Sequence, residues 1–132
     1  MDAKGITALI ETMTLDELIG QLLCYCYSPK WTDEQFSELV KRTKPGGLFF
    51  NSATPDKIKK FVGIANSENR IPVIVAADVE NGPGCAIQGE TLLPFAMAWG
   101  ASDDAELIEK AGEATAAIAR KKRYSLDVCS RR

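Results

Sequence analysis

Two carboxylates stand where an apolar run of the sequence stops. The run at residues 72–77 is followed directly by Asp78, and Glu80 comes two residues later. Side chains two positions apart on an extended segment point the same way. A charge that ends a buried apolar strand is costly unless a partner satisfies it, and a carboxylate can accept hydrogen bonds from neighbouring sugar hydroxyls. Asp78 and Glu80 are therefore candidate ligands for a sugar.

Two other interpretations of the same residues stay open. In the first, Asp78 caps the following loop, as acids at strand ends often do, and Glu80 is a solvated surface charge. In the second, both carboxylates bind Mg²⁺, but hard-metal sites recruit further oxygen ligands and the sequence places none nearby. We therefore expect no metal.

Other kinds of chemistry find no support in the sequence. Gly82, Gly84 and Ile87 do not fit the GxGxxG spacing, and no P-loop motif occurs, so we expect no cofactor. The chain has no histidine, which excludes Ser-His-Asp and Cys-His pairs. Its cysteines lack zinc-site spacing and are predicted to be reduced and structural: Cys24, Cys26, Cys85 and Cys129.

The elements around Asp78 alternate between helix and strand. Capping boxes at Thr14 and Thr32, and Thr54 followed by proline, each predict the start of a helix. Ser102 is predicted to cap a later helix with an inner stripe at Leu107, Ala111, Ala114, Thr115 and Ile118. A further helix is expected at 2–12, strands at 22–27, 48–50 and 72–77, and a long connection at 79–100.

This alternation predicts an α/β fold with a parallel sheet and helices outside it. In such folds ligands bind at the carboxyl ends of the strands, which is where Asp78 follows residues 72–77. A doubly wound sheet and a barrel look alike over this length of chain. The pattern of elements alone leaves both architectures open.

Composition sets the remaining bounds. The chain has 132 residues, 45% hydrophobic and 26% charged, which suits one globular domain. A net charge of −2 favours neither nucleic acid nor an anionic membrane as a partner. No apolar run approaches the ~20 residues of a membrane helix. The first four residues, Met-Asp-Ala-Lys, do not resemble a signal peptide, so a cytoplasmic location is expected.

Several segments, in order, resemble glycoside hydrolase family 3 over about residues 12–120. Met13–Leu22 resembles the family's opening helix and Gly46–Phe50 its second strand. Ile71–Glu80 with Asn81–Gly84 resembles its strand-end block of apolar strand, Asp, one residue, Glu and Gly. The next segment matches at Thr91–Pro94, Met97-Ala98, Gly100-Ala101 and Asp104.

The resemblance implies the N-terminal portion of a TIM-like (β/α)8 barrel, with about three to four βα units and parallel strands. It implies a retaining glycosidase acting on β-linked glucosides or N-acetylhexosaminides, with carbohydrate as its partner. The family's nucleophile and acid/base lie later, so no catalytic residue is expected in this chain, and the chain alone is expected to be inactive. Asp78 matches the family's sugar-binding Asp of the −1 subsite, and Glu80 a position that supports the loop.

Two stretches depart from the family pattern. The hexosaminidase branch has Gly-Gly-Arg after the Glu, whereas this chain has Asn81-Gly-Pro-Gly84 and no arginine nearby. Residues 121–132 contain five Lys or Arg and do not resemble the family's apolar fourth strand. We interpret 1–120 as a partial family domain and 121–132 as a basic tail, a product of truncation or frameshift, because a barrel needs ~250 residues.

Three hypotheses follow. The first is a fragment of a family 3 glycosidase that carries part of its sugar-binding subsite. The second is a non-enzymatic half-barrel that self-associates through open sheet edges. The third is a small, non-catalytic flavodoxin-like α/β domain that binds an unrelated ligand.

Overall fold

Four short parallel strands form one sheet in the computed structural model, which describes residues 2–121 and 126–127. The strands pair in the order β1-β2-β3-β4, so each neighbours the next along the chain. They span Cys24–Cys26 (β1), Gly47–Phe49 (β2), Ile74–Ala77 (β3) and Leu126–Asp127 (β4). In the register, Tyr25 pairs with Leu48 and Leu48 with Val75.

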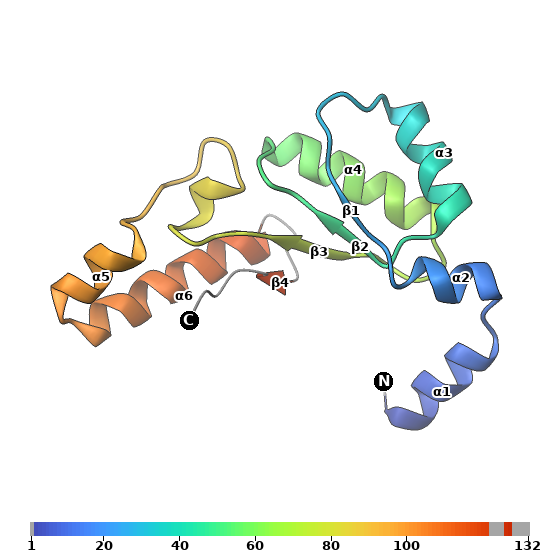
Figure 1. Ribbon diagram of the computed structural model, residues 1–132, viewed down its shortest axis with the longest axis horizontal. Coiled ribbons are helices and arrows are strands. Elements are labelled where there is room, and N and C mark those ends of the chain that lie inside the picture. The colour runs from blue at the N-terminus through green and yellow to red at the C-terminus, as the bar shows by residue number, and fades with distance from the viewer. Residues whose placement is uncertain (1, 122–125, 128–132) are drawn as a thin grey trace.

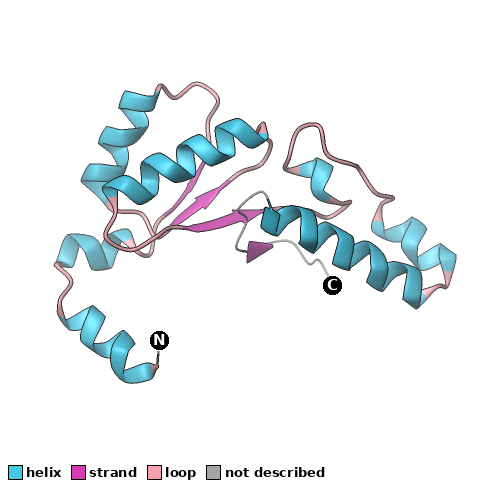
Figure 2. Cartoon of the chain, turned by 180° about the vertical axis from the view of Figure 1, so that it is seen from behind, coloured by secondary structure: helices cyan, strands magenta, loops and turns pink. Residues whose placement is uncertain are grey.

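Helices connect these strands and extend the chain at both ends of the sheet (Figure 1). They are α1 (Ala3–Glu11), α2 (Leu15–Gly20), α3 (Asp33–Thr43), α4 (Pro55–Glu68), the 3₁₀ turn η1 (Pro83–Cys85), α5 (Ala96–Ser102) and α6 (Ala105–Lys121). Helices α3 and α4 lie side by side on one face of the sheet, whereas α1 extends away from it, as Figure 2 shows from behind. No helix in the described part of the chain is long and apolar enough to cross a membrane.

Three of the four helix starts predicted from capping signals are confirmed. Thr14 and Thr32 each form a full capping box, in which the hydroxyl accepts from the backbone N–H three residues later. The Thr54 hydroxyl accepts from Lys57 N, with Pro55 in the first position of α4. These side chains satisfy backbone N–H groups that a helix cannot satisfy itself.

One face of the sheet carries the core. Tyr25, Leu48, Val75 and Ala77 alternate onto the face covered by α3 and α4, where aromatic side chains dominate. Tyr27 stacks on Phe50 at 5.2 Å between ring centroids and meets Phe61 edge-on at 5.1 Å; Phe36 lies 4.8 Å from Phe61. Ile118 and Ala119 bring α6 onto the same core.

The opposite face of the sheet is largely uncovered. Cys24 and Cys26 are exposed, and Ile74, which shares their face, is 54% exposed. Residues 72–77 were predicted to be buried on both faces. The prediction holds for Val73, Val75, Ala76 and Ala77, which are buried, but not for Ile74. In a barrel, this face is the inner one, which the opposite wall fills.

Strand order decides between the two architectures that the sequence left open. Right-handed crossovers between consecutive, adjacent parallel strands place every connecting helix on one face. A flavodoxin-like sheet instead reverses its strand order, as 2-1-3-4-5, and is covered on both faces. The order here is strictly sequential, and one face is largely uncovered within the described residues, so the chain has the fold of the N-terminal portion of a TIM-like barrel and not of a flavodoxin-like domain.

Local details of the prediction need correction. Ser102 does not cap α6: it ends α5, and its hydroxyl donates to Trp99 O, while the Asp104 carboxylate accepts from Leu107 N at 3.0 Å. The predicted loop at 79–100 contains η1 and most of α5. Of the predicted inner stripe of α6, Ala114 is exposed and Leu107 is 45% exposed.

The end of α2 and the assignment of the fourth strand also differ from the prediction. Helix α2 ends at Gly20, not Leu22. Gly20 lies against the end of α3, where an added Cβ would stand 2.3 Å from Lys44 O. Residues 121–132 were set apart from the fourth strand, yet Leu126–Asp127 pairs with β3 as β4. The remainder of that segment beyond Lys121 lies outside the described residues.

Candidate functional site

Asp78 is the first residue after β3, at the carboxyl edge of the sheet. Continuing the strand's alternation, it shares a side with Ile74 and Ala76, away from the core under α3 and α4. The side chain is half-buried, and within residues 2–121 and 126–127 no hydrogen bond or ion pair reaches its carboxylate. The carboxylate is therefore available to hydrogen-bond donors that come from above the inner face.

The neighbouring strands end beside Asp78. Phe50 N donates to Ala76 O at 2.9 Å, which brings the segment after β2 level with the end of β3. Across the other side of β3, the backbone of Asp127 pairs with Ala77. Tyr27 N donates to Phe49 O at 2.7 Å, so β1 reaches the same edge. The ends of β1, β2 and β4 thus lie at the same edge of the sheet as Asp78.

The loop after Asp78 is held by its own backbone. Gly82 N donates to Val79 O at 3.0 Å and closes a turn around Glu80 and Asn81. Leu93 N then donates to Asn81 O at 2.7 Å, and the Cys85 thiol donates to the Asn81 side-chain oxygen. These contacts fold the segment back onto itself and fix the chain immediately after Asp78.

A second set of contacts joins this loop to the one after β2. Ala53 and Ile87 form an isolated parallel bridge, with Ala53 N donating to Ala86 O at 3.0 Å and Gln88 N to Ala53 O at 2.9 Å. The Gln88 amide also donates to Ser52 Oγ at 3.2 Å. Ala53 and Ile87 are both buried, so the rim of the site rests on the main core.

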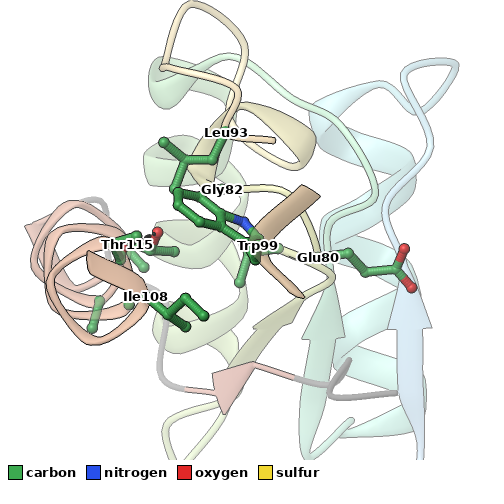
Figure 3. A pocket seen from close by; sticks show the side chains of 11 residues that line it. Glu80, Gly82, Leu93, Trp99, Ile108 and Thr115 are labelled. Atoms are coloured by element: carbon green, nitrogen blue, oxygen red, sulfur yellow. Dashed lines mark hydrogen bonds between the residues drawn. The ribbon is translucent and has the colours of Figure 1, made fainter. Parts of the chain in front are cut away.

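The Glu80 side chain points away from the apolar side chains that line a nearby cavity (Figure 3). It is exposed and belongs to the lining of a cavity of about 290 Å³ between the loop, α5 and α6. Figure 3 shows Leu93, Trp99, Ile108 and Thr115 gathered around this cavity, with the Glu80 carboxylate turned away from them. Asp78 does not line it. The structure thus does not bring the two predicted ligands into one cavity.

Sequence reasoning missed this cavity. Its lining combines Leu93 and Trp99, from the stretch predicted as a loop, with small residues of α6 such as Ala111 and Thr115. The alanine-rich stripe of α6 was noticed, but nothing in the spacing places Trp99 opposite it. An apolar lining without convergent polar groups fits packing better than recognition of a sugar.

The carboxylates of the site have no companions for metal binding. Among the residues that the structure describes, no three acidic, cysteine or histidine side chains lie together as a metal site would need. Cys24, Cys26 and Cys85 are free thiols, as predicted, but Cys24 and Cys26 are exposed and not buried in a core; Cys129 lies outside the described residues. The polar side-chain groups at this edge of the sheet are carboxylates and amides.

The family model described as the glycosyl hydrolase family 3 N-terminal domain matches residues 14–127. The chain belongs to glycosyl hydrolase family 3. The match covers α2 through β4 and places the edge that holds Asp78 within the family's N-terminal domain. It also includes β4, part of the segment that the sequence analysis assigned to a tail.

Sequence similarity to a beta-glucosidase agrees with this family membership. A periplasmic beta-glucosidase of Salmonella typhimurium is 28% identical over 113 residues, which cover 84% of this chain. The matched region is 14% of that protein, so the chain spans about a seventh of the relative's length.

Two solved structures share the fold over most of this chain. A beta-glucoside phosphorylase, BglX, bound to 2FGlc is similar with a TM-score of 0.82 at 20% identity, over 98% of this chain and 24% of that one. A family 3 beta-N-acetylglucosaminidase from Paenibacillus sp. str. FPU-7 is similar with a TM-score of 0.74 at 24% identity, over 89% of this chain and 24% of that one. This chain therefore has the fold of about a quarter of each of these proteins.

Proposed function

We propose that this chain supplies part of the sugar-binding subsite of a family 3 enzyme that acts on β-linked glucosides or N-acetylhexosaminides. Asp78 would accept hydrogen bonds from the hydroxyls of the sugar in the −1 subsite, and Glu80 would support the loop. The observation that carries the proposal is the position of Asp78: it follows β3 on the inner face, and its carboxylate makes no hydrogen bond within the described residues.

The proposal includes no nucleophile or acid/base in this chain. Retaining hydrolysis needs two carboxyl groups about 5 Å apart on either side of the scissile bond. The family resemblance puts both groups on later segments, and Glu80 is turned out of the cavity beside it. The purified chain should therefore not hydrolyse aryl β-glucosides or aryl β-N-acetylglucosaminides. Turnover above a buffer blank that Asp78→Ala abolishes would refute this part.

Between the two sugars, the loop favours a glucoside. The resemblance gives the hexosaminidase branch an arginine after its Gly-Gly, whereas Pro83 and Gly84 occupy this stretch and no arginine is close in sequence. Pro83 also begins η1, so the backbone at this position forms a turn.

The test is to titrate the 132-residue chain with methyl β-glucoside and, separately, with methyl β-N-acetylglucosaminide. Binding is measured from the NMR chemical shifts of the backbone amides of residues 77–82. Asp78→Asn should weaken binding about tenfold or more, because hydrogen bonds to a charged group contribute roughly 1.5–3 kcal/mol. Glu80→Gln is the matched control and should change binding less. Equal affinities for wild type and Asp78→Asn would exclude Asp78 as the sugar ligand.

A further inference from the structure

Asn81 differs from the other asparagines of the chain in the residue that follows it. Gly82 comes next, whereas Asn51 and Asn66 precede serine and Asn69 precedes arginine. An asparagine converts to aspartate or isoaspartate when the backbone nitrogen of the next residue attacks its side-chain carbonyl carbon. A glycine hinders this attack least, because it has no Cβ. By sequence alone, Asn81 is therefore the most reactive asparagine of the chain.

The reaction needs no partner other than water. Gly82 N forms a bond to Asn81 Cγ and gives up its proton, the Cγ–Nδ2 bond breaks, and ammonia leaves a cyclic succinimide behind. Water then opens the ring at either carbonyl, which yields aspartate or isoaspartate. Isoaspartate carries the backbone through the former side chain and lengthens it by one methylene. Either product adds a negative charge to the loop that follows Asp78.

The local backbone keeps the attacking nitrogen away from the side chain of Asn81. Gly82 N donates to Val79 O at 3.0 Å, so Asn81 is the third residue of a β-turn. Its φ is not positive, which leaves the type I form, in which the third residue has a ψ of about 0°. At that ψ the next nitrogen is rotated away from Cβ. Ring closure therefore requires the Asn81–Gly82 peptide to rotate.

Contacts from Leu93 and Cys85 resist this rotation. Leu93 N donates to Asn81 O at 2.7 Å, so the C=O of the peptide is hydrogen-bonded as well as its N–H. The Cys85 thiol donates to the side-chain oxygen of Asn81. Figure 3 shows Leu93 beside Gly82, and Leu93 Cγ lies 2.7 Å from the position of an added Cβ. The peptide cannot rotate without breaking its hydrogen bonds to Val79 and Leu93.

We propose that Asn81 is a latent modification site, which the closed loop protects and which converts to aspartate or isoaspartate from the open loop. The observed rate is then the intrinsic rate multiplied by the fraction of open loop, because local opening is an equilibrium of its own. Gly82 has a φ of +90°, so a bulkier and less reactive successor to Asn81 is strained. The fold thus requires the reactive dipeptide and also protects it.

Two other asparagines serve as internal references. Asn51 is exposed, and within the described residues neither its side chain nor Ser52 N makes a hydrogen bond. Asn66 lies inside α4, and its side-chain oxygen accepts from Val73 N at 2.9 Å, so it reacts only when the fold opens more widely. Serine follows both asparagines, which makes their intrinsic rates comparable.

The experiment follows deamidation of the full chain at each asparagine by peptide mass spectrometry, in buffer and in urea. Asn51 is exposed in both conditions and corrects for the effect of urea itself. In urea, Asn81 should react faster than Asn51, because glycine follows it. In buffer the order should reverse, with Asn81 about tenfold or more slower than in urea. An equal corrected rate at Asn81 in both conditions would overturn the proposal.

Cys85 provides a matched pair of variants. Cys85→Ala removes the donor to the Asn81 oxygen and should speed the reaction at Asn81 about two- to tenfold, the effect of one hydrogen bond. Cys85→Ser retains a hydroxyl donor and should stay close to wild type. The rate at Asn66 should be the same in both variants, which shows that the fold is intact. If Asn66 instead speeds up as much as Asn81, the protection comes from the whole fold and the proposed local protection is wrong.

Discussion

Gly82 holds the loop beside Asp78 in a conformation open to few other residues. Its φ is +90°, and an added Cβ would stand 2.7 Å from Leu93 Cγ. Backbone strain of this kind costs about 1–3 kcal/mol, and crowding a packed site costs about as much again. We expect Gly82→Ala to destabilise the chain by about 2–6 kcal/mol in urea unfolding, on the basis of those two costs.

A substitution at Gly89 distinguishes the cost of backbone strain from the cost of crowding. Its φ is +88°, close to that of Gly82, but nothing lies within 4 Å of an added Cβ. Gly89→Ala should therefore cost only the backbone part, about 1–3 kcal/mol. If the two variants lose the same stability, the contact with Leu93 contributes nothing and the loop is less closely packed than the structure shows.

Glu17 makes the start of α2 sensitive to acid. The backbone N–H of Thr14 donates to its carboxylate at 2.9 Å, which lowers the pKa of Glu17 from its ordinary 4.5. Desolvation opposes this effect only in part, and the charge of Arg70 adds a smaller effect that also lowers the pKa. A lowered pKa in the folded state stabilises the fold above pH 4.5, and this contribution is lost as the pH falls through the folded-state pKa.

Hydrogen exchange of the α2 amides between pH 6 and pH 3 measures this effect. After correction for intrinsic rates, protection in α2 should fall over the acid part of that range, whereas in Glu17→Gln it should stay level, because the amide retains the capping acceptor without titrating. A wild-type profile as flat as that of the variant would contradict the role given to Glu17.

Among the elements, α4 and α6 differ sharply in what they bury. Ile58 of α4 is fully buried, whereas Ile108 of α6 is 41% exposed and α6 has no buried residue. Ile58→Val should cost about 0.5–1.5 kcal/mol in urea unfolding, as for a fully buried isoleucine. Ile108→Val is the matched control on α6 and should cost markedly less. Similar losses would mean that α6 is packed as tightly as α4.

The same contrast explains which elements the sequence predicted well. Helices α2, α3 and α4 begin at Thr14, Thr32 and Thr54, whose side chains bond to backbone N–H groups three residues away. Such signals are local and can be read from the sequence. The split between α5 and α6 depends on Asp103, which adopts a left-handed conformation with φ 50°, and no short-range pattern marks that position.

For the candidate site, the sequence located Asp78 but not its surroundings. A carboxylate directly after an apolar run is visible in the sequence, and β3 does end at Ala77. The bridge between Ala53 and Ile87 joins residues far apart in the chain, and the contacts of Asn81 with Leu93 and Cys85 depend on how the loop folds. Neither arrangement follows from residue types and spacing alone.

At the scale of the whole molecule, the core is concentrated in one half of the chain. Buried side chains come from β2, β3, α3, α4 and the segments that follow β2 and β3, whereas α1, α5 and α6 contain none. Elements with few buried contacts open locally at low free-energy cost. Amides of β2, β3 and α4 should therefore exchange at least about a hundredfold more slowly than those of α1 and α5.

Mass spectrometry of exchanged peptides checks this pattern on the wild-type chain. Uniform protection along the chain would show that the ends of the molecule are packed as well as its centre.

The strictly sequential strand order has a consequence for how the chain acquires its structure during synthesis. Cys24 pairs with Gly47, and Gly47 with Ile74, so each strand finds its partner in the unit just before it. Contacts between close neighbours in sequence form quickly because little loop entropy is lost. The aromatic cluster of Tyr27, Phe36 and Phe61 is complete before α5 and α6 leave the ribosome. The nascent chain can thus consolidate one βα unit after another, from its first residues onward.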